Sequence, residues 1–364
     1  MTSQGRRNLK LLAFLAIVFL SLEGSLRIAF SSPTFLKRYV RGGGSDAMRL
    51  LWVNRHRGQE VTAYRFDVHD PRRGWAVRPA VPRSRAFGNR WLSTNSRGLR
   101  GMHEFEYEKT PGRLRIATIG DSFTFGDQVS DDQTYAALLG RQLADAEVLN
   151  FGVHGYGHDQ MLLYLQSDVI KYHPDVVILG FVAADMSRNL LAFRDFAKPY
   201  FDLLNGALEL RNVPVPTPEE VLHAEVYRLK TVDAYEIFRE RLSQGARPQQ
   251  TYVRQLTSAI LDEIVRTIQS NGARPLFVYL PVPREVHNPR RRGPTWGEAF
   301  FSKYCEAHNI ACVSLRPLFA DRAADPSVAK TLFRWGHWSE VGHGLAAPAL
   351  ADDLVTRGWA RKPE

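Results

Sequence analysis

The stretch "IATIGDSFTFGDQV", residues Ile116–Val129, decides the fold of this chain. An apolar run ends at Ile119, and Gly120, Asp121 and Ser122 follow it. None of these three residue types packs well on a pleated sheet face, so the strand ends at this point. The three residues form either an ordinary turn or a strand-to-helix turn that presents the hydroxyl group of Ser122.

Apolar runs and helical patterns alternate along the rest of the chain. Short apolar runs of the kind that form buried strands occupy residues 114–119, 148–151, 176–181, 275–281 and 311–315. Helical patterns lie between and after them, at residues 134–143, 160–172, 219–242, 252–270, 300–308 and 339–358. This alternation predicts an α/β fold with a roughly five-stranded parallel sheet covered by helices on both faces.

Four polar segments are predicted to meet at one edge of this sheet. They are "GDS" at 120–122, "GVHGYG" at 152–157, "VAADMSRN" at 182–189 and "WGHWSEVGH" at 335–343. The first three directly follow predicted strands, and the fourth comes after the fifth strand. Because ligands of open α/β sheets bind outside the carboxyl ends of the strands, the four segments predict one site.

The residue types in these segments fit nucleophilic catalysis. A serine hydroxyl needs a base to remove its proton, and a histidine has an ordinary pKa near 6.5 that suits the task, so Ser122 and His337 are candidates for nucleophile and base. Gly155 has no side chain to keep its N–H away from a ligand. Taken one at a time, the same features also fit a plain turn and a loop histidine. We expect His154 and His158 in a surface loop and a structural role for a fourth histidine, His343.

In this order the segments resemble the SGNH, or GDSL-type, hydrolase superfamily, over about residues 114–355. "TIGDSFTFG", "NFGVHGYG", "VVILGFVAAD" and "HWSEVGH" are similar to its blocks, and "TNSRGLRG" at 94–101 is similar to the lead-in of exported bacterial members. The resemblance implies a three-layer flavodoxin-like domain. It also implies that Ser122 is the nucleophile, that His337 is the general base, and that the N–H groups of Ser122 and Gly155 form the oxyanion hole.

The sequence departs from the family pattern in two places. Ala184 stands where the family has an asparagine that donates to the oxyanion, and Trp335 and Arg334 stand where it has the triad aspartate. Losing one oxyanion donor typically costs 10²–10³ in turnover, which predicts a weakened enzyme. The candidates for supporting polar roles are Asp121, Asp185 and Asn189.

The N-terminus predicts an export signal. Arg6, Arg7 and Lys10 precede the uncharged run Leu11–Leu22, and no small-residue cleavage site follows it directly. We therefore expect residues 1–40 to form an uncleaved anchor in the inner membrane with its flank, with secretion after cleavage as the alternative. Residues 41–110 are expected to form a linker, "RGGGSD", and an irregular extension packed on the main domain, and residues 111–364 the hydrolase-like domain.

Charge and composition bear on whether the protein binds nucleic acids, metals or cofactors. The chain has 364 residues and a formal net charge of +10, but no nucleic-acid motif accompanies the basic run Arg290–Arg292, so we expect a solvated loop there and no nucleic acid. The histidines lack zinc spacing, and neither a metal nor another cofactor is expected. Spacing alone does not decide whether Cys305 and Cys312 form a disulfide or remain free.

Together these features predict an extracytoplasmic, membrane-anchored serine esterase. Its expected substrate is an acyl ester, and deacetylation of a cell-envelope or extracellular glycan or lipid ester suits the location. Two alternatives stay open. One is an O-acyltransferase of polysaccharides that uses the same site, and the other is a catalytically silent binding protein with an SGNH fold.

Overall fold

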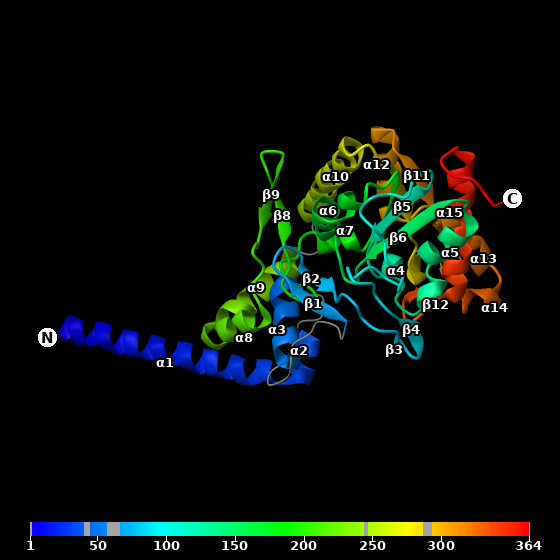
Figure 1. Ribbon diagram of the computed structural model, residues 1–364. Coiled ribbons are helices and arrows are strands. Elements are labelled where there is room, and N and C mark those ends of the chain that lie inside the picture. The colour runs from blue at the N-terminus through cyan, green and yellow to red at the C-terminus, as the bar shows by residue number, and fades with distance from the viewer. Residues whose placement is uncertain (1, 40–43, 57–65, 244–246, 287–292, 364) are drawn as a thin grey trace.

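The structure is a computed structural model that describes residues 2–39, 44–56, 66–243, 247–286 and 293–363. Its centre is a five-stranded sheet in the order β11-β10-β7-β5-β6 (Figure 1). All four neighbouring pairs run parallel. The strands are β5 (Leu114–Gly120), β6 (Ala146–Gly152), β7 (Val176–Phe181), β10 (Arg274–Tyr279) and β11 (Ala311–Ser314). Each overlaps one of the apolar runs, so the predicted parallel α/β sheet is confirmed.

The sheet is buried on both faces, which explains the continuous apolar runs. Every residue of β7 is buried. Val177, Leu179 and Phe181 belong to one core cluster, and Val176 and Ile178 belong to the other. Since successive side chains of a strand point to opposite faces, the two clusters lie on the two sides of the sheet. The result is the predicted three-layer architecture.

Two sets of helices cover the sheet. On the first cluster's side lie α6 (His158–Ser167), α10 (Arg247–Ser270) and α12 (Trp296–His308). On the other side lie α5 (Tyr135–Gln142), α13 (Arg316–Ala323) and α15 (Glu340–Thr356), whose N-cap is Ser339 as predicted. The short helices are η1 (Asp131–Gln133), η2 (Val169–Tyr172), α4 (Ser122–Phe125), α7 (Asp185–Arg188), α11 (Pro283–Val286) and α14 (Pro326–Ala329).

The N-terminal part is more regular than the sequence indicated. It contains α1 (Ser3–Ser31), α2 (Pro33–Tyr39), α3 (Ser45–His56) and two hairpins, β1 (Asp67–Asp70) with β2 (Gly74–Val77) and β3 (Ser84–Ala86) with β4 (Arg90–Leu92). The expected linker therefore runs into α3 at Ser45, and its residues 41–43 lie outside the described ones. Helix α3 forms because Leu50, Trp52 and Val53 are buried against the rest of the protein.

Helix α1 projects from the body, as Figure 1 shows in dark blue. Its segment Gln4–Ser31 is long and apolar enough to cross a membrane. The chain between β7 and β10 contains an insertion. It consists of the hairpin β8 (Tyr200–Leu204) and β9 (Ala207–Arg211) and the helices α8 (Pro218–Tyr227) and α9 (Lys230–Ser243). Helix α9 packs on α1.

The two cysteines and the basic run of the sequence differ in what the structure describes. Cys305 and Cys312 form a disulfide, which joins α12 to β11. The basic run at residues 290–292 lies outside the described residues.

Candidate active site

The turn after β5 presents Ser122 at the first position of α4. Asp121 caps this helix, and its Oδ1 accepts the N–H of Phe123 at 2.9 Å. The turn passes close to the end of β6, because a Cβ added at Gly152 would lie 2.1 Å from the backbone nitrogen of Phe125. Glycine is therefore required there, and Ser122 lies at the carboxyl edge of the sheet with only 5% of its surface exposed.

His337 meets Ser122 from the far end of the sequence. It lies on β13 (His337–Trp338), which pairs with β12 (Phe333–Arg334) in a two-stranded hairpin. Its Nε2 is 2.9 Å from Ser122 Oγ, so the hydroxyl can donate directly to the ring. The ring of Phe123 packs on the imidazole with centroids 5.2 Å apart. The two candidate catalytic side chains are thus in proton-transfer geometry.

The Nδ1 nitrogen of His337 is the atom that the aspartate of a complete triad would contact. Within the described ranges, no hydrogen-bond partner meets the buried Nδ1. The turn residue Trp335 has a positive φ of 52° and is 87% exposed. Arg334 pairs with Glu340, with Nη1 2.8 Å from Oε2. Neither residue that replaces the family aspartate therefore offers a carboxylate to His337.

A carboxylate approaches His337 from the Nε2 side instead. Asp127 Oδ2 lies 3.9 Å from Nε2, and the N–H of Asp127 donates to the carbonyl of Ser122 at 3.0 Å. Its other oxygen, Oδ1, is 3.7 Å from Nδ1 of His154. The Nε2 of His154 is 2.6 Å from Oδ1 of Asp67, a residue of β1. A buried row of carboxylate, imidazole and carboxylate thus leads from the N-terminal part of the chain to the dyad.

His154 carries the positive charge of this row. Burial alone lowers the pKa of His154, but the negative charges of Asp67 and Asp127 outweigh it and raise the pKa to about 10. The expectation of a surface loop for His154 and His158 is wrong, because they are 1% and 0% exposed. Burial, followed by the charge of Arg188, lowers the pKa of His158 to about 3.

Arg188 joins three of the four polar segments. Its Nη1 lies 3.1 Å from Asp121 Oδ2 and 2.5 Å from Asp185 Oδ1, and it donates to the carbonyl of Tyr156 at 2.9 Å. Asp121 Oδ2 in turn is 3.5 Å from Ser122 Oγ. Burial raises the pKa of Asp185 well above its usual range, against the opposing effect of Arg188. The guanidinium therefore ties these segments together, and the carboxylate of Asp121 lies between it and the serine hydroxyl.

The remaining candidates, Gly155, Asn189 and His343, are buried in three different surroundings. Gly155 has φ of +79°, and a Cβ there would lie 2.2 Å from Oδ2 of Asp195, so its close packing requires glycine. Asn189 is fully buried, and its amide donates to Thr257 Oγ1 at 3.1 Å. That amide is thus engaged with α10. His343 is also buried, and its Nδ1 accepts the N–H of Tyr135 at 3.0 Å, a structural contact.

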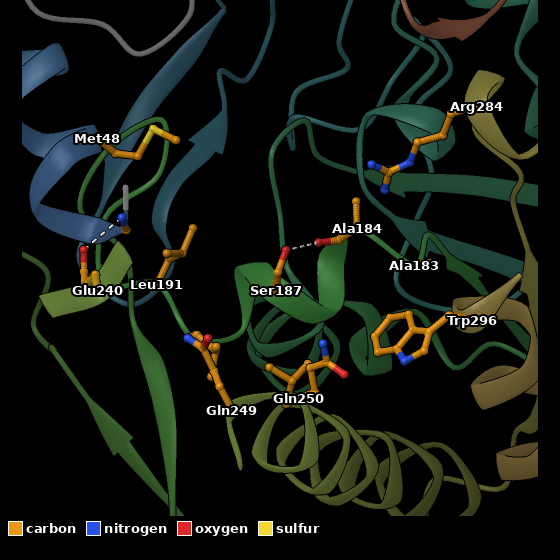
Figure 2. Close-up of a pocket in the computed structure, with 13 residues that line it drawn as sticks. Met48, Ala183, Ala184, Ser187, Leu191, Glu240, Gln249, Gln250, Arg284 and Trp296 are labelled. Atoms are coloured by element: carbon orange, nitrogen blue, oxygen red, sulfur yellow. Dashed lines mark hydrogen bonds between the residues drawn. The ribbon is translucent and has the colours of Figure 1, made fainter. Parts of the chain in front are cut away.

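A cavity of about 680 Å³ opens beside the segment that follows β7. Ala183, Ala184 and Ser187 line it on the side of α7, as Figure 2 shows. The opposite walls carry both apolar and polar side chains, from α3, α9, α10, α11 and α12: Met48, Glu240, Gln249, Gln250, Val253, Arg284 and Trp296. Its size falls in the range of small-ligand sites.

Sequence reasoning missed Asp127, Asp67 and Arg188. Asp127 had a local signal, because it follows the serine by five positions on the same turn. Arg188 lies in the third polar segment, in which only Ala184, Asp185 and Asn189 were considered as candidates. Asp67 had no signal, since 87 residues separate it from His154.

A three-layer parallel sheet with Ser122 and His337 in contact at its carboxyl edge has the architecture of an α/β hydrolytic enzyme. The profile of the GDSL-like lipase/acylhydrolase family matches residues 118–345, which is more than half of the chain, and the chain belongs to this family. It is an ester-hydrolysing enzyme. No curated protein matches the chain.

Solved structures similar to this chain include three hydrolases. A GDSL-like lipase from Bacteroides thetaiotaomicron VPI-5482 has 12% identity and a TM-score of 0.38, with 68% of this chain and 91% of that chain covered. A psychrotrophic esterase from Pseudoalteromonas sp. has 13% identity and a TM-score of 0.39, with coverage of 67% and 97%. A two-domain esterase active on acetylated mannans has 12% identity and a TM-score of 0.41, with coverage of 69% and 51%.

Proposed function

We propose that the protein cleaves acyl esters through a covalent Ser122 intermediate, with His337 as the general base. The observation that carries the proposal is the 2.9 Å contact between His337 Nε2 and Ser122 Oγ. His337 takes the hydroxyl proton while Oγ bonds to the ester carbonyl carbon. The bond from that carbon to the alcohol oxygen then breaks, and His337 returns the proton to the alcohol. Water attacks the acyl-enzyme in the same way and releases the acid.

The oxyanion is stabilised by backbone donors, and an ion pair beside Ser122 limits the opposing charge. We assign the N–H groups of Ser122 and Gly155 as donors, since both segments lie at the carboxyl edge of the sheet. The asparagine that would add a third donor is replaced by Ala184. Arg188 pairs with Asp121, with Nη1 3.1 Å from Oδ2, and so offsets the carboxylate that lies beside Ser122. An uncompensated carboxylate at that position would raise the energy of a developing anion.

Asp127 takes over part of the role of the missing triad acid. Its carboxylate faces Nε2, so it attracts the imidazolium without holding the ring in one tautomer. Packing of Phe123 on the ring then restricts the orientation of His337.

We further propose that α1 anchors the enzyme in the inner membrane with the catalytic domain outside the cytoplasm. Arg6, Arg7 and Lys10 precede the apolar run, in the order typical of an export signal. The exposed surface of α1 supports this proposal, because an apolar helix that projects into water is unfavourable. Esters of the cell envelope or of extracellular glycans are the substrates available at that location.

Ala183, Ala184 and Ser187 connect the cavity to the polar segment that also carries Arg188, and Ser122 and His337 do not line it. We propose that the cavity holds the glycan part of the ester. Trp296 is 43% exposed and offers a ring for sugar stacking, while Gln249, Gln250 and Arg284 offer hydrogen-bond groups. The same cavity has room for an acceptor sugar, which favours acyl transfer as the second candidate function. Chromatography of the products formed from an acetylated oligosaccharide, with and without an added unacetylated one, separates hydrolysis from transfer.

A fluorophosphonate that reacts with activated serines tests the proposed mechanism. We expect it to label the full-length protein in detergent, and we expect Ser122→Ala and His337→Ala to abolish labelling. Ser130→Ala is the matched control, because Ser130 caps η1 on the next turn of the chain. A folded wild-type protein that neither reacts nor hydrolyses an activated acetyl ester would falsify the proposal.

A further inference from the structure

Residues 226–232, called the α8–α9 turn below, comprise the end of α8, the connection and the start of α9, and they expose four apolar side chains. Val226 is 65% exposed, Tyr227 73%, Leu229 40% and Val232 44%. Single exposed apolar residues are common on protein surfaces, but four within seven positions form a patch. Such patches mark surfaces that contact a membrane or another protein.

This turn is fixed to helix α1. The carboxylate of Glu23 accepts the N–H groups of Lys230 and Thr231, each at 3.0 Å, at the start of α9. The guanidinium of Arg27 donates to the carbonyl of Arg228 at 3.1 Å. Figure 1 shows α8 and α9 beside the second half of α1. The exposed patch therefore lies next to the residue at which the uncharged run of α1 ends.

The segment of α1 that is long enough to cross a membrane includes charged residues, and its uncharged run alone is shorter than a bilayer span. Leu11–Leu22 has twelve residues, which make about 18 Å of helix at 1.5 Å per residue. The hydrocarbon core is about 30 Å thick. A bilayer adapts to a short span by thinning, and residues that flank the span enter the interface. The boundary between the lipid hydrocarbon core and the headgroups then lies close to the α8–α9 turn.

We infer that the α8–α9 turn inserts Val226, Tyr227 and Leu229 into the interface of the bilayer that α1 crosses. A tyrosine with an apolar ring and a polar hydroxyl suits the headgroup level. The partly exposed guanidinium groups of Arg27 and Arg228 lie beside it and pair with carboxylates of the protein. The inference rests on the membrane anchoring proposed above. With α1 and the turn both held, the catalytic domain has a fixed orientation on the membrane.

Helix α9 supplies an internal control, because it leads away from the end of the uncharged run. Its later residue Ile237 packs against Phe30 and Leu36, which follow in α1 and α2. Leu242 lies twelve positions after Lys230 in α9, about 18 Å farther along the helix. It is 69% exposed, much like Tyr227. The two positions thus differ in distance from the membrane but not in access to solvent.

Site-specific fluorescence tests the inference in the full-length protein. Both native cysteines form the disulfide, so Tyr227→Cys and Leu242→Cys each introduce the one free thiol for an environment-sensitive nitrobenzoxadiazole label. The protein is placed in vesicles of phosphatidylethanolamine and phosphatidylglycerol, with and without doxyl-labelled lipid. We expect blue-shifted emission at position 227 and at least twofold quenching by doxyl lipid, and neither effect at position 242. Val226→Cys repeats the test at a second position.

The outcomes separate this inference from the anchor. Protein that fails to float with the vesicles contradicts membrane anchoring and with it the inference. Protein that floats but shows solvent-like emission at position 227 overturns the inference alone. Blue-shifted emission that doxyl lipid leaves unquenched means that another protein surface, such as a second copy of the chain, covers the turn, and it overturns the inference as well.

Discussion

Replacing Asp127 by asparagine removes a carboxylate that faces His337 while keeping the size of the side chain. The carboxylate oxygen is 3.9 Å from His337 Nε2. Two unit charges at that distance attract by about 4 kcal/mol at an effective dielectric constant of about 20. The His154 cation on the other side of Asp127 offsets part of this attraction. We therefore expect Asp127→Asn to raise the activation free energy by about 2–3 kcal/mol, or to lower kcat/KM by about 30- to 150-fold.

The assay is steady-state hydrolysis of an activated acetyl ester by the wild type, Asp127→Asn and Asp127→Glu. The glutamate variant keeps the charge and should retain more activity than the asparagine variant. Asp132→Asn is the matched control, because Asp132 is an exposed carboxylate of the same segment. Thermal unfolding of each variant excludes misfolding as a cause. If Asp127→Asn unfolds at the wild-type temperature and keeps kcat/KM within twofold of wild type, the assignment of Asp127 is refuted.

Three further predictions concern the groups around the dyad. Arg188→Gln should lower kcat by about 10² with a smaller effect on KM, since Arg188 offsets the charge of the Asp121 carboxylate beside Ser122, and an equal loss in Arg188→Lys would contradict a role for charge. Gly155→Ala should destabilise the protein by about 1–3 kcal/mol in urea unfolding, because the φ of +79° and the contact with Asp195 both exclude a Cβ. Asp67 and Asp127 raise the pKa of His154 to about 10, so protonation of His154 stabilises the folded protein. This stabilisation is complete below about pH 6.5 and is lost as the pH rises toward 10. In urea unfolding, the free energy of unfolding of His154→Gln should not show this decrease at alkaline pH. If the free energies of wild type and variant change with pH in parallel, the prediction is wrong.

The sheet was predictable because its physical cause is local in the sequence. A strand buried on both faces needs apolar side chains at every position, and β7 shows this pattern from Val176 to Phe181. The N-cap Ser339 was predictable for a similar reason, since a capping side chain bonds to backbone groups two or three residues away. The N-terminal extension was less predictable, because α3 depends on burial against segments that are distant in the chain.

For the active site, the sequence by itself determined which residue types follow the strands. The positions of the polar segments after the strands predicted that Ser122 and His337 meet at one edge, and the chemistry of a hydroxyl and an imidazole made them candidates for nucleophile and base. Only the tertiary structure decided how the site is completed without the usual aspartate and asparagine. It brought Asp67 to His154, His154 to Asp127, and Arg188 to Asp121. Electrostatic interactions depend on distance in space, and buried charges act over several ångströms whatever their separation along the chain.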